Sequence, residues 1–455
     1  MTPAPGCGPE RDEPASPSTG HWKAGLAKVC ITPQSPVPMS GYAARTKPSE
    51  GVLQDLHARV LALEDPAGRR AVLVAADLIG CSAATASRLT GEIARRHGVA
   101  RDRVLLAFSH THGGPKVANL LEGSEDPRVA DEHRQAVVDY TTTLLKTMAD
   151  AVASALANLQ PARLAFGRGE ATFAMNRRQK TDKGYVIGVN PEGPVDNDVP
   201  VLRVESADGD LRAVVFGYAC HNTTLGGTMY ELHGDYAGFA EAGLEDRHAG
   251  ALAMFMAGCG GDANPHPRGT VDLARQHGQA LAEAVERVLA GPMQPVRAGL
   301  RTACETVDLP FAPPPTRETL EARAEDTNQY RRQHARRLLA MLDRGDRLPA
   351  SYPCPVQAWR LGEEVTLVAL GGEVVVDYVL RLRKELGPEG LWVAAYANDV
   401  FAYVPSRRVL QEGGYEPETS MLHYSHPGPF APEVEDVLVG KVREVVARVR
   451  PGGRD

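Results

Sequence analysis

The sequence predicts an α/β fold of the mixed (α+β) kind, in which mixed β-sheets are flanked by helices. Apolar strand-like runs alternate along the chain with amphipathic helix-like segments, and this alternation is typical of sheets covered by helices. The 455 residues are 43% hydrophobic and 24% charged, which is enough for one large enzyme domain or for two to three ordinary ones. No repeat of about 20–50 residues is present, which excludes a solenoid or propeller.

The N-terminal half predicts a hairpin, a helix, a strand and a second helix, in that order. ARVLALED (58–65) and RAVLVAAD (70–77) flank the turn sequence PAGR, which predicts a β-hairpin. The segment 82–98 begins with Ser and ends with Gly, which favour the two ends of a helix. DRVLLAFS (102–109) predicts an apolar strand, and apolar residues three and four apart over 133–159 predict a long helix.

The second half continues the same alternation. Strands are expected at 200–205 and 212–220, joined by an Asp-Gly-Asp turn. A helix is expected over 271–290, where Gly291-Pro292 ends the pattern. Two further helices are expected at 373–387 and 431–450.

We expect a disordered tail over 1–21, rich in Pro, Gly, Ser and charge, followed by a single domain over 22–455. A proline-rich break precedes 318–344, which predicts one charged amphipathic helix, and strand patterns resume at 356–370. The segment 310–355 is therefore interpreted as an insertion or linker helix within the domain.

Charge and composition exclude several classes of protein. The 50 basic and 57 acidic residues are spread along the chain, so no polybasic region indicates nucleic acid as a partner. The longest apolar runs, such as 72–80, fall short of the roughly 20 residues of a transmembrane segment. Seven cysteines without CxxC spacing predict reduced thiols, and no apolar signal-peptide core is evident, so we expect a cytoplasmic protein of undetermined oligomeric state.

Two histidines follow the strand at 102–109, in the sequence Ser-His-Thr-His-Gly-Gly-Pro. Side chains alternate along a strand, so His110 and His112 are expected on one face, where two imidazoles suit a zinc site. A pair of surface or hydrogen-bonded histidines is the alternative. His221 ends a second apolar strand in the same way, which favours a metal site further.

Other segments carry polar groups whose roles stay open at this point. His233 lies in a Leu-His-Gly-Asp-Tyr cluster, and glycines 258, 260 and 261 follow an apolar strand, where they form either an oxyanion cradle or a simple turn. Glu373 follows the VTLVAL strand at an expected helix start, as a metal ligand or as a charge that complements the helix dipole. Tyr403 and Tyr415 alone indicate only packing.

Taken in order, these segments resemble the catalytic domain of the neutral/alkaline, non-lysosomal ceramidases, which hydrolyse the amide of N-acylsphingosine at a zinc ion. The resemblance spans almost the whole expected domain. The segments that carry it are AGLAKVCITP, MSGYA, SHTHGGP, NRR, VDNDVPVLRVE, HGDYAGFA, GCGGDANP, LGGEVV and NDVFAYVP followed by YE. The resemblance implies a Zn²⁺-dependent amidase that cleaves an N-acyl amide bond of a small molecule or lipid with zinc-activated water.

Residue by residue, the resemblance makes His110, His221, Glu373 and Tyr403 the zinc ligands. The remaining roles belong to side chains around the metal. The resemblance implies that His112 hydrogen-bonds the reacting carbonyl or the leaving amine, that Arg177 faces the site, and that Tyr415 polarises the carbonyl oxygen.

The chain departs from the family at three points. The family has a serine before the proline of the segment matched by GDANP, whereas this chain has Asn264. An obligatory serine nucleophile would then be missing, whereas attack by zinc-activated water would leave Asn264 to hydrogen-bond substrate and alter specificity. The 455 residues leave no room for the family's C-terminal β-sandwich domain, and neither a secretion signal nor a membrane-contact stripe is evident. These departures favour a more soluble N-acyl compound over ceramide.

Two alternatives remain from the sequence. An amidohydrolase-type (β/α)₈ barrel also begins with His-x-His on a strand. In that fold His221 would be a further metal ligand and Asp399 the late catalytic aspartate, but the hairpin over 58–77 does not fit eight βα units. A zinc-binding family member without catalytic activity is the other, because Asn264 replaces the serine.

Overall fold

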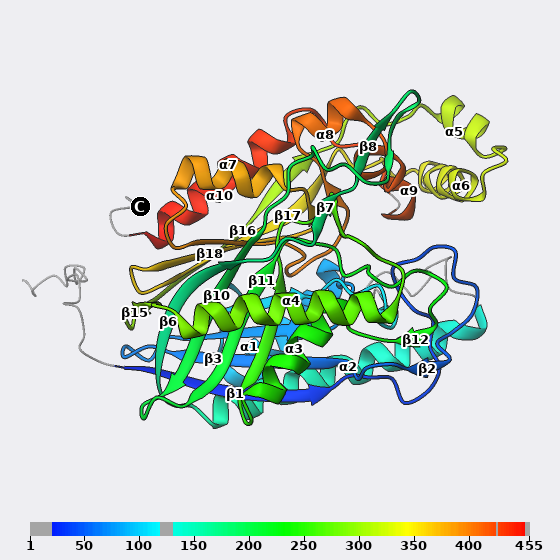
Figure 1. The fold of residues 1–455 in the computed structure, drawn as a ribbon. Helices are drawn as coiled ribbons and strands as arrows, with labels where there is room; N and C mark the ends of the chain where they lie inside the picture. The colour runs from blue at the N-terminus through cyan, green and yellow to red at the C-terminus, as the bar shows by residue number, and fades with distance from the viewer. Residues whose placement is uncertain (1–20, 119–130, 425, 451–455) are drawn as a thin grey trace, which may run out of the picture.

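The computed structural model describes residues 21–118, 131–424 and 426–450 (Figure 1). Within these residues the larger sheet has nine strands in the order β13-β11-β10-β6-β1-β3-β4-β5, with β15 beside β6. Its strands are β1 Trp22–Cys30, β3 His57–Glu64, β4 Arg70–Ala76, β5 Val104–Phe108, β6 Gln160–Glu170, β10 Asp198–Ser206, β11 Leu211–Tyr218, β13 Leu252–Ala257 and β15 Gln294–Val296. Antiparallel and parallel neighbours occur together, so the mixed α/β prediction is confirmed and the closed parallel barrel is excluded.

A smaller, four-stranded sheet packs face to face against the larger one. It runs in the order β16-β17-β18-β20. Its strands are β16 Leu300–Pro310, β17 Ser351–Leu361, β18 Val365–Leu370 and β20 Leu391–Ala394. Trp359, Leu367 and Trp392 from this sheet share one buried cluster with Leu61 and Val215 from the larger sheet, so the core lies between the two sheets.

Helices cover the outer faces of both sheets (Figure 1). The larger sheet carries α1 Ala83–His97, α2 Asp131–Ala157, α3 Asp235–Arg247 and α4 Val271–Ala290, and the smaller sheet carries α7 Asp377–Leu386 and α10 Val434–Val449. Strand alternation explains this arrangement, because Val72 and Val74 pack with α1 and α2 whereas Leu73 faces the other sheet. None of the helices among the described residues has the length and apolarity to cross a membrane.

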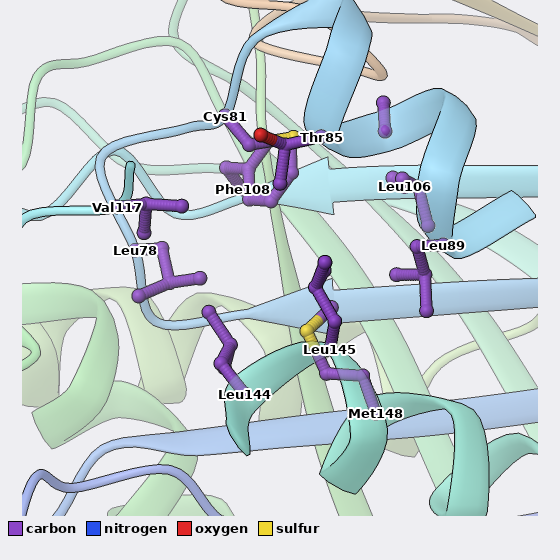
Figure 2. Close-up of a pocket in the computed structure, with 11 residues that line it drawn as sticks. Leu78, Cys81, Thr85, Leu89, Leu106, Phe108, Val117, Leu144, Leu145 and Met148 are labelled. Carbon is purple, nitrogen blue, oxygen red and sulfur yellow. The ribbon is translucent and has the colours of Figure 1, made fainter. Parts of the chain in front are cut away.

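A small pocket lies between α1, α2 and β5 (Figure 2). Apart from Cys81 and Thr85, its walls are apolar side chains such as Leu89, Phe108 and Met148. The lining therefore contains no cluster of polar or titratable side chains.

Several predicted elements are confirmed. β3 and β4 pair as the expected antiparallel hairpin. The side chain of Ser82 caps the first turn of α1, and Gly98 ends that helix with a left-handed φ of 67°. The six cysteines among the described residues are all free.

Two helix predictions are wrong in detail. The segment 318–344 forms two helices, α5 Arg317–Arg323 and α6 Gln329–Asp343, because the side chain of Asn328 accepts two backbone N–H groups and begins a new helix. The helix expected from residue 373 begins only at α7, because Glu373 pairs with another strand. Since β16 and β17 pair along their whole lengths, α5 and α6 belong to the connection between two neighbouring strands. The tail expected over 1–21 lies, up to residue 20, outside the described residues.

Short elements gather at the carboxyl ends of three parallel strand pairs: β4 with β5, β11 with β13, and β18 with β20. These elements are β2 Gly51–Val52, β7 Ala174–Asn176, β8 Arg178–Thr181, β9 Gly184–Ile187, β12 Glu231–Leu232, β14 Ala263–Pro265, β19 Glu373–Val374, β21 Tyr403–Val404, α8 Arg407–Glu412, the helical turn η2 Tyr415–Thr419 and α9 Met421–Tyr424; the turn η1 Arg101–Arg103 lies before β5. Polar side chains from both sheets therefore meet at one place in the fold.

Candidate metal centre

Two local backbone pairings bring the four predicted ligands together. Thr111 and Asn222 form an isolated parallel bridge, which places His110 beside His221. β19 and β21 pair so that Glu373 lies directly opposite Tyr403. The four side chains come from segments far apart in sequence, and all four are buried.

The ring orientations of His110 and His221 are fixed by backbone carbonyls. Nδ1 of His110 lies 2.7 Å from the carbonyl oxygen of Ile79, and Nδ1 of His221 lies 2.8 Å from that of Gly260. A carbonyl oxygen can only accept, so each Nδ1 is the donor and each neutral ring keeps its lone pair on Nε2. This is how a protein orients histidines that bind a metal.

Both lone pairs point at one carboxylate oxygen. Oε2 of Glu373 lies 3.1 Å from Nε2 of His110 and 2.9 Å from Nε2 of His221. The hydroxyl of Tyr403 lies 3.1 Å from the same nitrogen of His221. Acceptor atoms this close repel one another unless a proton or a cation lies between them. Imidazole nitrogens and a carboxylate oxygen are ligands that zinc takes, so the donor set fits a divalent cation.

Protonation states agree with metal binding. Burial lowers the pKa of His221 to about 4, which keeps its imidazole neutral near pH 7. Burial alone would raise the pKa of Glu373, but positive charge and N–H donation from His110 and His221 outweigh that effect and hold this pKa well below its ordinary value; a cation bound between these groups would take the place of that proton. A neutral imidazole and an ionised carboxylate are the forms that bind metal ions.

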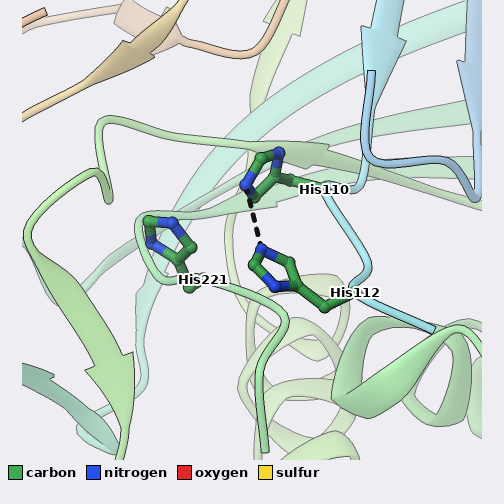
Figure 3. A group of neighbouring side chains, drawn as sticks. All are labelled: His110, His112 and His221. Atoms are coloured by element: carbon green, nitrogen blue, oxygen red, sulfur yellow. Dashed lines mark hydrogen bonds between the residues drawn. The ribbon is translucent and has the colours of Figure 1, made fainter. Parts of the chain in front are cut away.

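His112 lies against the other two histidines (Figure 3). The ring nitrogens that the three residues offer lie within 4.8 Å of one another, so this group could also hold a metal ion. Nε2 of His112 lies 3.3 Å from Nε2 of His110, but Nδ1 of His112 has no hydrogen-bond partner among the described residues. His112 is 8% exposed, against 1% for His110 and 0% for His221, so it faces the accessible side of the group.

The two histidines of the His-x-His motif do not meet for the reason that the sequence indicated. β5 ends at Phe108, and His110 adopts a left-handed φ of 58°, so strand alternation does not place them. The turn, the Nδ1 contact of His110 and the Thr111–Asn222 bridge place them instead.

Arg177, Asn264 and Tyr415 lie together beside Tyr403 in the structure. The guanidinium of Arg177 lies 5.3 Å from the ring centre of Tyr403 and 5.7 Å from that of Tyr415. Nη1 of Arg177 donates to Oδ1 of Asn264 at 3.3 Å. Tyr415 is half-buried, Asn264 is 7% exposed and His112 is 8% exposed, so these side chains are more exposed than His110 and His221.

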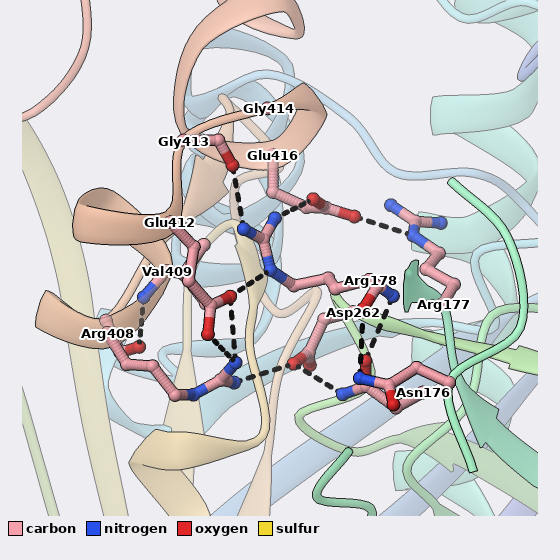
Figure 4. Close-up of polar contacts among 12 residues, drawn as sticks. Asn176, Arg177, Arg178, Asp262, Arg408, Val409, Glu412, Gly413, Gly414 and Glu416 are labelled. Atoms are coloured by element: carbon pink, nitrogen blue, oxygen red, sulfur yellow. Dashed lines mark hydrogen bonds and ion pairs between the residues drawn. The ribbon is translucent and has the colours of Figure 1, made fainter. Parts of the chain in front are cut away.

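A buried polar network, which the sequence did not reveal, holds Arg177 in place (Figure 4). Nε of Arg177 donates to Oε1 of Glu416 at 2.8 Å, and the other oxygen of Glu416 accepts from Nη1 of Arg178. Arg178 also donates to Oε2 of Glu412 at 2.9 Å and to the carbonyl of Gly413 at 2.7 Å. β8 is thereby fastened to α8 and η2, the elements that flank Tyr415.

The network extends to the loop that carries Asn264. Arg408 donates to Glu412 at 3.1 Å and to Oδ2 of Asp262 at 3.3 Å, and Asn176 donates to the same oxygen at 3.2 Å. Oδ1 of Asp262 accepts the backbone N–H of Val376 at 2.9 Å. One set of ion pairs and hydrogen bonds thus positions the segments on both sides of the site.

The interpretation of the glycine-rich loop as an oxyanion cradle is wrong. The amides of Gly258, Gly260 and Gly261 donate to the carbonyls of Tyr218, Gly258 and Val374, at 2.9, 2.8 and 2.9 Å, so none of them is free for a ligand. A Cβ on Gly261 would lie 2.7 Å from the backbone oxygen of Glu373. The loop is glycine-rich because other backbone approaches it closely.

Comparisons with known proteins identify the family. Residues 22–279, more than half of the chain, match the N-terminal domain of the neutral/alkaline non-lysosomal ceramidases. The chain belongs to this ceramidase family.

Sequence relatives of this ceramidase-family protein match it over about half of its length. Neutral ceramidase of Pseudomonas aeruginosa is 25% identical over 271 residues, which is 56% of this chain and 38% of that protein. Neutral ceramidase A of Dictyostelium discoideum is 27% identical over 251 residues, which is 51% of this chain and 34% of that protein. The matched region is therefore less than two fifths of the relatives' own length.

The ceramidase fold continues beyond residue 279. The crystal structure of the Pseudomonas aeruginosa enzyme matches with a TM-score of 0.69 over 94% of this chain and 74% of that chain, at 20% identity. A ceramidase complexed with C2 gives a TM-score of 0.71 over 94% of this chain and 75% of that chain, at 19% identity. The similarity in fold therefore extends beyond the region matched by the family model.

Two further tyrosines of this ceramidase-family protein escaped the sequence argument. The hydroxyl of Tyr424 donates to Oε1 of Glu373, the oxygen that does not face the histidines. The ring of Tyr396 lies 4.3 Å from that of His110, and its hydroxyl has no partner among the described residues. Tyr396 lies two residues before the NDVFAYVP segment that carries the resemblance, and nothing in the sequence marks Tyr424. His233 is fully buried beside the site, where its carbonyl accepts the hydroxyl of Thr111 at 2.8 Å.

Proposed function

We propose that the protein is a zinc-dependent amide hydrolase that cleaves an N-acyl amide bond, in ceramide or in a more soluble N-acyl compound. The observation that carries this proposal is the convergence of two Nε2 lone pairs, the Glu373 carboxylate and the Tyr403 hydroxyl on one point. Membership of the ceramidase family supports the same chemistry.

In this proposal the metal ligands are His110, His221, Glu373 and Tyr403, and His112 stays outside the set. The reason is the second contact of each ring, because the Nδ1 atoms of His110 and His221 are anchored to carbonyls whereas that of His112 is not. Glu373 is anchored as well, by the hydroxyl of Tyr424.

When bound, zinc supplies Lewis-acid chemistry, because it lowers the pKa of water and polarises a carbonyl oxygen. The chain's own groups bind and orient the amide. His112, with Nδ1 unoccupied, hydrogen-bonds the reacting carbonyl or the leaving amine. The half-buried Tyr415 directs its hydroxyl to the carbonyl oxygen from the side opened by His112.

Asn264 makes water the nucleophile in this proposal, because a carboxamide nitrogen is a poor nucleophile in place of a hydroxyl. Water adds to the amide carbon, the carbon–nitrogen bond breaks, and the nitrogen leaves with the bonding electrons and takes up a proton. The products are a carboxylic acid and an amine, and no covalent intermediate with the chain is required.

Metal content and amide hydrolysis, measured on the same preparation, test the proposal. We expect about one zinc ion per chain and hydrolysis of at least one member of a panel of N-acyl amides that includes a short-chain ceramide. Bound zinc without turnover of any amide would overturn the enzymatic function and leave a zinc-binding protein. A preparation that hydrolyses amides equally well after complete metal removal would overturn the metal centre.

A further inference from the structure

One side chain beside the metal centre has its acceptor occupied and its donors free. Oδ1 of Asn264 accepts from Nη1 of Arg177 at 3.3 Å and from the hydroxyl of Thr223 at 3.2 Å. An arginine nitrogen can only donate, so the oxygen of the carboxamide has to face Arg177 and the NH₂ group has to point away from it. Nδ2 of Asn264 has no hydrogen bond to any described residue.

Arg177 also has one donor without a hydrogen-bond partner among the described residues. Its Nε donates to Glu416 at 2.8 Å and its Nη1 donates to Asn264, but its Nη2 is buried and has no partner among the described residues. Because the guanidinium lies against the rings of Tyr403 and Tyr415, this unpaired nitrogen belongs to the metal centre and not to the distant protein interior.

Both donors are held rigidly. Glu416, which fixes Arg177, is itself 2% exposed and held by Arg178. Thr223, which fixes Asn264, is 3% exposed and follows His221 by two residues. A buried N–H without an acceptor costs about 1–3 kcal/mol. Nη2 of Arg177 is such a donor, and Asn264, which is bound to the same guanidinium, offers its Nδ2 as a second one. Neither nitrogen has an acceptor among the described residues, so the two form a site for an acceptor that comes from outside.

We propose that Asn264 Nδ2 and Arg177 Nη2 together bind an oxygen atom of the substrate that carries negative charge, and that Asn264 is thereby a specificity-determining residue. This inference rests on the proposed amidase function. Two parts of an N-acyl compound supply such an oxygen: the carbonyl oxygen, which becomes negative as water adds, or a carboxylate on the amine half, as in an N-acyl amino acid.

The substitution Asn264→Asp tests this site with little change in shape. One carboxylate oxygen keeps the contacts with Arg177 and Thr223, while the other replaces the NH₂ group and repels a negatively charged oxygen. Asn328→Asp is the matched control, because it makes the same chemical change at the N-cap of α6, where Asp caps as well as Asn does. Thermal unfolding of both variants checks that they fold.

Kinetics on two substrates with the same acyl chain distinguish the two sources. N-lauroylglycine carries a carboxylate and N-lauroylethanolamine does not. We expect Asn264→Asp to lower kcat/KM at least about tenfold. A loss in kcat on both substrates assigns the carbonyl oxygen, and a rise in KM confined to N-lauroylglycine assigns the carboxylate. Equal kinetics for Asn264→Asp and Asn328→Asp on both substrates would overturn the inference.

Binding separates this inference from the proposed function. If the wild-type protein cleaves neither of these substrates nor any other amide of the panel, the proposed function fails, and calorimetric titration of EDTA-treated protein with N-lauroylglycine then decides the inference. Binding that Asn264→Asp weakens at least about tenfold, while Asn328→Asp leaves it unchanged, supports the donor pair. Equal affinity of the two variants, or no binding to the wild-type protein, contradicts it.

Discussion

Among single residues, the difference between His110 and His112 gives the sharpest test of the metal centre. Of these two histidines, only His110 has its Nδ1 hydrogen-bonded to a backbone carbonyl. We therefore expect His110→Ala to lose most of its bound zinc. His112→Ala should keep zinc but lose about 100-fold or more in kcat, because it removes a hydrogen bond to the reacting groups. Zinc content by mass spectrometry and amidase assays measure the two effects. Equal zinc loss in both variants would instead favour a site made of three histidines.

The backbone of Gly41 packs against the ring of His112. Gly41 has a left-handed φ of 94°, and a Cβ built there would lie 2.4 Å from Cγ of the His112 ring. We expect Gly41→Ala to displace this ring, with a loss of activity of about tenfold or more and about 1–3 kcal/mol of stability. Amidase assays and thermal unfolding provide the measurements.

Gly68→Ala is the control for this prediction. Gly68 also has a left-handed φ, of 76°, but nothing lies within 4 Å of a Cβ built there. It therefore carries the backbone strain without the clash. If Gly41→Ala and Gly68→Ala reduced activity equally, contact with His112 would not be the reason for the glycine.

At the scale of elements, the buried ion pairs of Glu416 fasten η2 to β8. Glu416→Gln removes the charge that faces both Arg177 and Arg178, and breaking a buried pair costs about 3–5 kcal/mol. We expect a comparable loss in the free energy of unfolding and a fall in activity, because Tyr415 and Arg177 lose their shared anchor. Denaturant unfolding measures the loss, and the exposed Glu418 in the same turn supplies the control Glu418→Gln. An equally small loss for both variants would contradict the anchoring role.

Local elements were predictable because their signals are local. The cap residues Ser82 and Gly98 mark α1 in the sequence, and the PAGR turn marks the hairpin of β3 and β4. The pairing of Glu373 with Tyr403 joins residues 30 positions apart through a two-residue bridge, which no periodicity indicates. The predicted helix therefore begins four residues too early. Glu373 itself is predicted as a metal ligand from the resemblance of its segment to the ceramidases.

At the scale of the whole molecule, the site draws on both halves of the chain. The family match ends at residue 279, yet Glu373, Tyr403 and Tyr415 come from beyond it. Their positions depend on the packing of the smaller sheet against the larger one. Sequence motifs supplied the chemistry of these residues, but the contacts of Tyr424 and Arg178 depend on that packing and carry no sequence signal.

The packing of the smaller sheet also buries an acid whose charge should set the pH dependence of stability. Asp399 is 1% exposed and accepts a hydrogen bond from Tyr352 at 2.7 Å, while its Oδ1 has no partner among the described residues. Burial raises its pKa from 3.8 to about 6 despite that hydrogen bond. The folded state therefore binds this proton more tightly than the unfolded chain does, so its contribution to stability is complete below pH 3.8 and is lost as the pH rises through about 6.

Asp399→Asn keeps the shape and removes the charge. We expect the variant to be more stable than the wild-type protein at pH 8, by up to about 3 kcal/mol at 1.36 kcal/mol per pKa unit, and equally stable at about pH 3, below the pKa of 3.8 in the unfolded chain. Denaturant unfolding at both pH values measures the difference. Asp208→Asn makes the same chemical change at an exposed turn. This control should show the same difference in free energy of unfolding between the two pH values as the wild-type protein. A variant that is less stable at pH 8 would show that the Asp399 carboxylate has a stabilising partner in the folded protein.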